Sequence, residues 1–176
     1  MHLYFDIETS GLERNSFLLQ LSAISEKQDK FDIYIRPPCP LSQECTSITG
    51  LSFVSNILFK DGVPLHSVGL HPALYSFRQW TDSLIKEERT LDLIGYNSNA
   101  FDVPFLVKAY SRFDQTLPDI TSCYDVLPSI RKMQRNSDKL DKLAKSTIKL
   151  EDLGALFIPD SDIMKTKDFH NSLYDC

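Results

Sequence analysis

Three segments near the start of the chain have the apolar patterns of strands. Residues 3–9, 17–25 and 31–37 alternate apolar and polar positions or run apolar, and Gly, Asn, Lys and Asp lie between them. Such runs, bounded by turn-forming residues, are typical of consecutive β-strands. The third segment ends at Pro37 and Pro38. We therefore predict an antiparallel meander of three strands.

After the three predicted strands, the sequence predicts a short helix or turn, a loop and then a longer helix. Residues 42–52 are predicted to form a short helix or turn that ends at Gly50, and residues 62–72, which contain several Gly and Pro, are predicted to be loop. Residues 73–88 are predicted to form an amphipathic helix with one face on the sheet. The apolar positions of that face are Leu74, Phe77, Trp80, Leu84 and Ile85.

The second half of the chain alternates between strand-like and helix-like segments. Residues 90–97 and 121–126 are predicted strands. Residues 102–113, between them, form a predicted helix that tolerates Pro104 in its first turn. A meander followed by strands that alternate with helices indicates an α/β fold, with a mixed sheet flanked by helices.

A charged segment lies towards the C-terminus, at residues 136–157. We predict that its first half is a surface helix or a mobile loop. Its second half is predicted to be a helix with an apolar stripe, made of Leu150, Leu153 and Phe157.

Length and composition narrow the class of protein. With 176 residues and 42% hydrophobic content, the chain can bury one sizeable core, and we expect a single domain over residues 1–176. The 19 basic and 24 acidic residues give a net charge of -5, so any contact with nucleic acid should be local. No apolar run approaches the ~20 residues of a membrane span, and the N-terminus lacks the layout of a signal peptide. We expect an intracellular protein, nuclear or cytoplasmic, that is not secreted and binds no membrane.

Two acids interrupt the first predicted strand. Asp6 and Glu8 are two residues apart, so in a strand they lie side by side on one face while the flanking apolar residues point to the other. Adjacent carboxylates repel each other; they are stable where a divalent cation neutralises them, where one holds a proton, or where water screens an exposed strand end. A ligand site and an exposed strand end are both open alternatives here. A phosphatase of the HAD type is disfavoured, because it would carry Asp-x-Asp at this position.

Three further residues complete a candidate site. Asp102 opens the predicted helix, a position where an acid is favourable even without a function. His170 and Asp175 are five residues apart, so on a regular helix they would point about 140° apart. We therefore expect His170 on a loop before a short helix and Asp175 one turn inside it. Asn171 or Ser172 would cap that helix.

These motifs together resemble a known family. D-x-E near the start, N-x-x-x-F-D-x-P-x-L in the middle and H-x-x-x-x-D at the end occur in order. The chain resembles the DEDDh-type 3′→5′ exonucleases, the DnaQ-like enzymes of the ribonuclease-H-like fold, and is most similar to the TREX group and its PML-associated relatives. The segments that carry the resemblance are FDIETSGL, ITGLS, YNSNAFDVPFL, KLEDLGALF and HNSLYD.

The resemblance implies a two-metal exonuclease. Four acids would hold two divalent cations, Mg²⁺ or Mn²⁺, and His170 would be the general base that takes a proton from the attacking water. The product would be a nucleoside 5′-monophosphate. The four acids are Asp6, Glu8, Asp102 and Asp175.

The resemblance also implies contacts to the substrate. Thr9 matches a position near the terminal 3′-hydroxyl. Leu12 and Ile48 match apolar residues that wedge against the last base, and ordinary core packing is the alternative for both. Tyr96 stands where many relatives carry histidine, and its phenol could still donate a hydrogen bond to a phosphate.

The expected partner is the 3′ end of a nucleic acid, with DNA favoured over RNA and single strands over duplexes. A homodimer through a sheet edge is a further expectation. Relatives continue the last helix beyond the final acid, whereas this chain stops at Cys176, so we expect the helix to be truncated there. The alternative functions are an exonuclease-like interaction module with weak or no activity, a polymerase proofreading exonuclease, and an RNA-directed exoribonuclease of the same fold.

Overall fold

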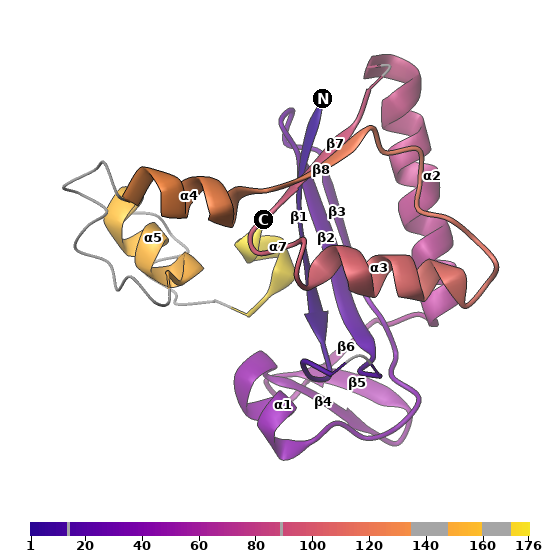
Figure 1. Ribbon diagram of the computed structural model, residues 1–176. Coiled ribbons are helices and arrows are strands. Elements are labelled where there is room, and N and C mark those ends of the chain that lie inside the picture. Colours follow the sequence, from indigo (N-terminus) through magenta and orange to yellow (C-terminus); the bar gives the residue numbers. More distant parts are fainter. Residues whose placement is uncertain (14, 89, 135–147, 160–169) are drawn as a thin grey trace.

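The computed structural model describes residues 1–13, 15–88, 90–134, 148–159 and 170–176 (Figure 1). Over this part of the chain, the main sheet has five strands in the order β3-β2-β1-β7-β8. The first three form the predicted antiparallel meander, and β7 and β8 run parallel to β1. The mixed sheet is therefore confirmed. Its strands are β1 (His2–Thr9), β2 (Leu18–Ser25), β3 (Lys30–Tyr34), β7 (Asp92–Gly95) and β8 (Ser122–Asp125).

Two helices cover one face of this sheet. The core there joins Phe5 and Ile7 of β1 to Phe77 of α2 and Tyr110 of α3. Side chains alternate along a strand, so packing these apolar residues turns Asp6 and its neighbours to the other face. The helices are α2 (Leu70–Glu88) and α3 (Asp102–Ser111).

Other helices lie away from that core. In Figure 1, α7 crosses β1 and β2, and α4 and α5 form a pair to one side. Leu127 of α4, Leu153 of α5 and Ile148 make a small apolar cluster of their own. These helices are α4 (Val126–Gln134), α5 (Leu150–Phe157) and α7 (Ser172–Asp175).

The prediction for residues 136–157 was partly right. Helix α5 covers the second half, where Leu153 is buried, but Phe157 is exposed and does not extend an apolar stripe into the core. The expected surface helix or loop falls mainly on residues 135–147, which lie outside the described residues.

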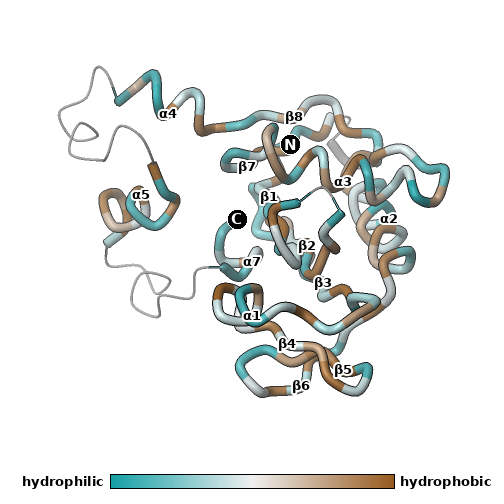
Figure 2. Tube along the Cα trace, turned by 60° about the horizontal axis from the view of Figure 1, so that its bottom comes forward, coloured by the Kyte–Doolittle hydropathy of each residue, from teal (hydrophilic) through white to brown (hydrophobic). Residues whose placement is uncertain are grey.

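A second, smaller sheet was not predicted. It has the order β4-β5-β6 and packs with α1 around Leu19, Cys45, Leu51 and Leu58, beside the carboxyl end of β1 (Figures 1 and 2). The predicted helix or turn ending at Gly50 is confirmed as α1, and Gly50 has a left-handed φ of 68°. These elements are α1 (Gln43–Thr49), β4 (Leu51–Val54), β5 (Ile57–Lys60) and β6 (Val63–Leu65).

The prediction of a loop over residues 62–72 was wrong at both ends, where the structure has β6 and the first turn of α2. The hairpins of the small sheet turn through Ser55-Asn56 and Asp61-Gly62, and all four residues have positive φ. Two-residue turns of this kind match the twist of antiparallel strands. Asp61-Gly62 is therefore a hairpin signal in the sequence, whereas Ser55-Asn56 is not one of the usual hairpin dipeptides.

The described helices include none long and apolar enough to cross a membrane.

Close packing at the end of β7 gives a testable prediction. A Cβ added at Gly95 would lie 2.6 Å from the Cβ of Ser98 and 2.9 Å from a ring carbon of Phe5. We expect Gly95→Ala to lower the free energy of unfolding by about 1–3 kcal/mol, because the strand and the following turn must separate. Urea unfolding would measure the loss. Gly69→Ala is the control, since its Cβ would meet only Pro72 at 3.6 Å; equal stability of the two variants would contradict this packing.

Candidate active site

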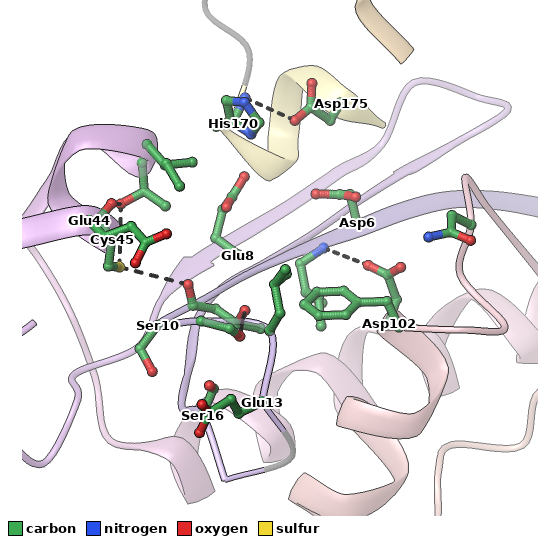
Figure 3. Close-up of a pocket in the computed structure, with 18 of the residues that line it drawn as sticks. Asp6, Glu8, Ser10, Glu13, Ser16, Glu44, Cys45, Asp102, His170 and Asp175 are labelled. Carbon is green, nitrogen blue, oxygen red and sulfur yellow. Dashed lines mark hydrogen bonds between the residues drawn. The ribbon is translucent and has the colours of Figure 1, made fainter. Parts of the chain in front are cut away.

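Asp6 and Glu8 lie on the face of β1 opposite the main core. Asp6 pairs across the strands with Ser22 of β2, and Glu8 pairs with Gln20. Figure 3 shows both carboxylates rising from the strand towards α7. The strand periodicity in the sequence therefore placed the two acids correctly, side by side and away from the core.

Asp102 approaches Asp6 from the first turn of α3. Its Oδ1 accepts a hydrogen bond from the backbone N–H of Ile7, at 3.2 Å. Strand β7 pairs only with residues 2–4 of β1, so Asp102 takes the place of a strand partner further along. The side chain is buried, with 3% exposure. The predicted start of the helix at Asp102 is confirmed. This position holds the carboxylate of Asp102 against β1, the strand that carries Asp6 and Glu8.

Asp175 and His170 come from the last segment of the chain. His170 precedes α7 with a positive φ of 61°, and Asn171 caps the helix by accepting from the N–H of Leu173. The backbone N–H of His170 donates to Oδ2 of Asp175 at 3.1 Å. The arrangement expected from the five-residue spacing, with histidine before the helix and acid inside it, is what the structure has.

Three of the acids form one group. Among the described residues, ligand oxygens of Asp6, Glu8 and Asp175 all lie within 4.8 Å of one another. Asp102 is outside this group but stands beside Asp6 (Figure 3). Segments separated by most of the chain length thus deliver four carboxylates to one place.

Burial and mutual repulsion raise the pKa values of these acids. The pKa of Asp6 is raised well above its ordinary value, by burial first and then by the three neighbouring acids. Burial and Asp175 raise the pKa of Glu8 to about 7, against the opposing charge of Lys60. Burial raises the pKa of Asp102 to about 6, against the backbone N–H groups that bond it. Without a bound cation, the state in which all four acids are ionised is therefore unfavourable.

The donor set fits a hard divalent cation. Carboxylate oxygens are the ligands that Mg²⁺, Mn²⁺ and Ca²⁺ take in proteins. A cation among Asp6, Glu8 and Asp175 would offset the repulsion that otherwise requires protons. The residues present can hold such an ion.

A pocket of about 790 Å³ opens over the acids, and Thr9, Leu12, Ile48, Tyr96 and His170 also line it. Leu12 is 85% exposed and Ile48 is 51% exposed. Core packing, the alternative for these two residues, is therefore ruled out.

Two pocket residues already have hydrogen-bond partners. The hydroxyl of Thr9 donates to the carbonyl of Gly11 at 2.7 Å, which closes the turn after β1. The hydroxyl of Tyr96 donates to the carbonyl of Ile148, before α5. Tyr96 therefore links β7 to the α4–α5 cluster at the edge of the pocket.

Sequence reading missed several polar residues around the site. Gln20 and Ser22 of β2 are buried and bond to α7, and Nε2 of His170 lies 3.6 Å from Oε1 of Glu151 on α5. The sequence did carry one sign of the first two. They occupy alternate positions in a largely apolar strand, LLQLSAIS, and so share one face.

Known proteins resemble this chain in both sequence and structure, although no family model matches it. A PolC-type DNA polymerase III from Streptococcus mutans is 31% identical over 125 residues, covering 68% of this chain and 7% of that protein. The 3′-5′ DNA exonuclease Cap18 of Escherichia coli is 30% identical over 110 residues, covering 57% of this chain and 52% of Cap18. Three prime repair exonuclease 2 of Mus musculus is 30% identical over 107 residues, covering 61% of this chain and 42% of that enzyme.

Among solved structures, E. coli exonuclease I in complex with a dA16 oligonucleotide matches 99% of this chain and 38% of its own, with a TM-score of 0.67 and 18% identity. This match shows the fold. The chain belongs to the DEDDh-type, DnaQ-like family of 3′→5′ exonucleases, as its motifs predicted. It spans about half or less of the length of these curated relatives.

The raised pKa values predict how the metal-free protein responds to pH. The folded protein holds a proton on Glu8 up to about pH 7, whereas the unfolded chain releases it near the ordinary value of 4.5. Stability should therefore fall as pH rises from about 5 to 8, by on the order of 1–3 kcal/mol. Urea unfolding in EDTA would measure this.

Glu8→Gln should flatten that dependence, and saturating Mg²⁺ should remove it, because the cation competes with protons for the same oxygens. Glu13→Gln, an exposed acid of the pocket rim, is the control and should leave the slope unchanged. A metal-free protein that becomes more stable from pH 5 to 8 would contradict the described electrostatics.

Proposed function

We propose that this protein is a metal-dependent 3′→5′ exonuclease, which removes nucleotides from the 3′ end of DNA, preferably single-stranded, and releases nucleoside 5′-monophosphates. The observation that carries the proposal is the convergence of Asp6, Glu8, Asp102 and Asp175, with His170 beside them, on one open pocket. They come from three separate parts of the chain, β1, α3 and the segment of α7, and no packing need explains a largely buried group of like charges. Cap18 is named a 3′-5′ DNA exonuclease and the murine relative a three prime repair exonuclease, which supports the direction of attack and the reaction type.

The acids would hold two divalent cations, Mg²⁺ or Mn²⁺. Such ions, when bound, supply positive charge for the phosphodiester and lower the pKa of a bound water. Asp6, Glu8 and Asp175 form the ready group for one ion, and Asp102 is the further ligand beside Asp6. The chain's own contribution is to fix these oxygens in a partly buried, pre-arranged set.

His170 is the proposed general base. Its ring is half exposed at the mouth of the pocket, where water can reach it. An imidazole can accept a proton at neutral pH. Water would attack phosphorus as His170 takes its proton, the bond from phosphorus to the 3′-oxygen of the preceding nucleotide would break, and that oxygen would take up a proton.

Substrate orientation follows from the pocket rim. The exposed Leu12 and Ile48 are suited to contact the terminal base, since apolar side chains in water gain by covering a base face. Thr9 and the turn after it lie next to Glu8 and would meet the terminal 3′-hydroxyl. Tyr96 lines the same pocket, but its hydroxyl is engaged with Ile148, so we assign it to shaping the rim rather than to holding phosphate.

The proposed substrate sets the expected binding partner. Exonuclease I, the structural neighbour, is described in complexes with dA16 and dT13 oligonucleotides, which supports a single DNA strand as the partner here. A homodimer through a sheet edge would use β3 or β8, the outer strands of the main sheet. The proposed place of action is intracellular, nuclear or cytoplasmic.

The direct test is degradation of a 5′-labelled single-stranded oligonucleotide. With Mg²⁺ or Mn²⁺ we expect a ladder that shortens from the 3′ end, and EDTA or Asp6→Asn should abolish it. His170→Ala should lower kcat by about 10²–10⁴-fold while Mn²⁺ still binds. His66→Ala, an exposed histidine outside the pocket, is the matched control. Full activity of Asp6→Asn, or an equal loss in His66→Ala, would overturn the proposal.

A further inference from the structure

The segment that carries His170 and Asp175 cannot hold its own shape. Helix α7 has four residues, a single turn, and a turn of this length does not form in isolation. Its position must come from contacts with the sheet, and it lies on β1 and β2. Those contacts therefore decide where Asp175 stands relative to the acids of β1.

Strand register lays a polar surface beneath α7. Asp6 of β1 is paired with Ser22 of β2, which is paired with Asp32 of β3, and Glu8 is paired with Gln20. Residues opposite each other in neighbouring strands share a face of the sheet. The face that carries the two acids therefore continues across β2 and β3 as Gln20, Ser22 and Asp32. The alternate residues of β2, Leu19 and Leu21, are apolar and pack into the cores.

Both the oxygen and the nitrogen of the Gln20 carboxamide form hydrogen bonds on this surface. Its Oε1 accepts from the backbone N–H of Ser172 at 3.3 Å, and its Nε2 donates to Oδ1 of Asn171 at 3.0 Å. Nε2 also donates to Oδ1 of Asp32, at 2.8 Å. Gln20 is 1% exposed, so water cannot replace these partners if they are lost.

Ser22 makes a second, parallel connection. Its hydroxyl lies 2.7 Å from Oδ1 of Asp32 and 2.6 Å from the hydroxyl of Ser172. A carboxylate only accepts, so the single proton of Ser22 goes to Asp32, and Ser172 must donate to Ser22. Ser22 and Ser172 are both fully buried. The chain of hydrogen bonds thus runs from α7 through β2 to β3.

We propose that Gln20 and Ser22 are positioning residues for the reaction: they fix α7 on the sheet and so set the carboxylate of Asp175 at its distance from Asp6 and Glu8. This inference rests on the proposed function and concerns the same site. Neither residue touches the pocket, so both act through Asn171 and Ser172. Residues that orient a metal ligand are typically worth 10–100-fold in metal affinity or activity.

The experiment measures Mn²⁺ affinity by calorimetry and kinetics on one oligonucleotide. Gln20→Met keeps a similar side-chain length but removes all three hydrogen bonds. We expect it to weaken Mn²⁺ binding by about 10–100-fold and, at saturating metal, to lower kcat with KM changed by less than about threefold. Ser22→Ala should act in the same direction, and it serves as the test variant if Gln20→Met does not fold.

Ser25→Ala is the matched control for Ser22→Ala. Ser25 is also fully buried and lies on the same strand, but its hydroxyl bonds to Asp29 in the next turn and not to α7. It should lose a similar amount of stability and keep its Mn²⁺ affinity and kcat. Equal losses of affinity in the two serine variants would show general destabilisation and overturn the inference.

A double-mutant cycle separates this inference from the proposed function. Gln20→Met added to Asp175→Ala should change Mn²⁺ affinity by less than about twofold, because its effect passes through Asp175. An undiminished further loss would mean that Gln20 acts elsewhere, and the inference would be wrong. If Asp175→Ala alone leaves Mn²⁺ affinity unchanged, the proposed metal site itself fails. If Asp175→Ala weakens binding and neither Gln20→Met nor Ser22→Ala does, only the inference fails.

Discussion

Repulsion among closely spaced, partly to fully buried carboxylates is the constraint on which this structure depends. Asp6 and Glu8 lie next to each other on β1, and Asp102 and Asp175 are brought up to them from α3 and α7. Burial strengthens the repulsion, because charges interact more strongly where water is excluded. The fold must therefore supply enough stability elsewhere to keep these groups together until protons or cations bind.

The rest of the molecule can be understood as the frame that does this. Phe5 and Ile7 of β1 pack between the sheet and helices α2 and α3. Because side chains alternate along a strand, Asp6 and Glu8 then lie on the opposite face of the sheet. Asp102 is tied to the backbone of β1 by the N–H of Ile7. On the sheet face that carries Asp6 and Glu8, Gln20 and Ser22 form hydrogen bonds to the short segment that carries Asp175. Two of the acids also give one carboxylate oxygen to a backbone N–H: Asp102 accepts from Ile7, and Asp175 accepts from His170.

Local patterns in the sequence predicted the parts of the fold that local forces decide. The meander, α3 beginning at Asp102, and the layout of His170, Asn171 and Asp175 all follow from periodicity and capping. The small sheet was missed although its Asp61-Gly62 turn is a recognised hairpin signal, because strands of three or four residues carry little periodicity. The bonds from Gln20 to Ser172 and from Tyr96 to Ile148 join residues far apart in the chain, and no local pattern reports them.

A crystal structure with Mn²⁺ and a nucleoside 5′-monophosphate would show directly whether the four carboxylates hold two metal ions, because Mn²⁺ is located by its anomalous scattering. We expect one Mn²⁺ ligated by Asp6, Glu8 and Asp175 and a second beside Asp6 and Asp102, with the phosphate of the nucleotide facing both and α7 still on β2. Anomalous density that is absent from these four carboxylates, or that lies only elsewhere on the protein, would contradict it.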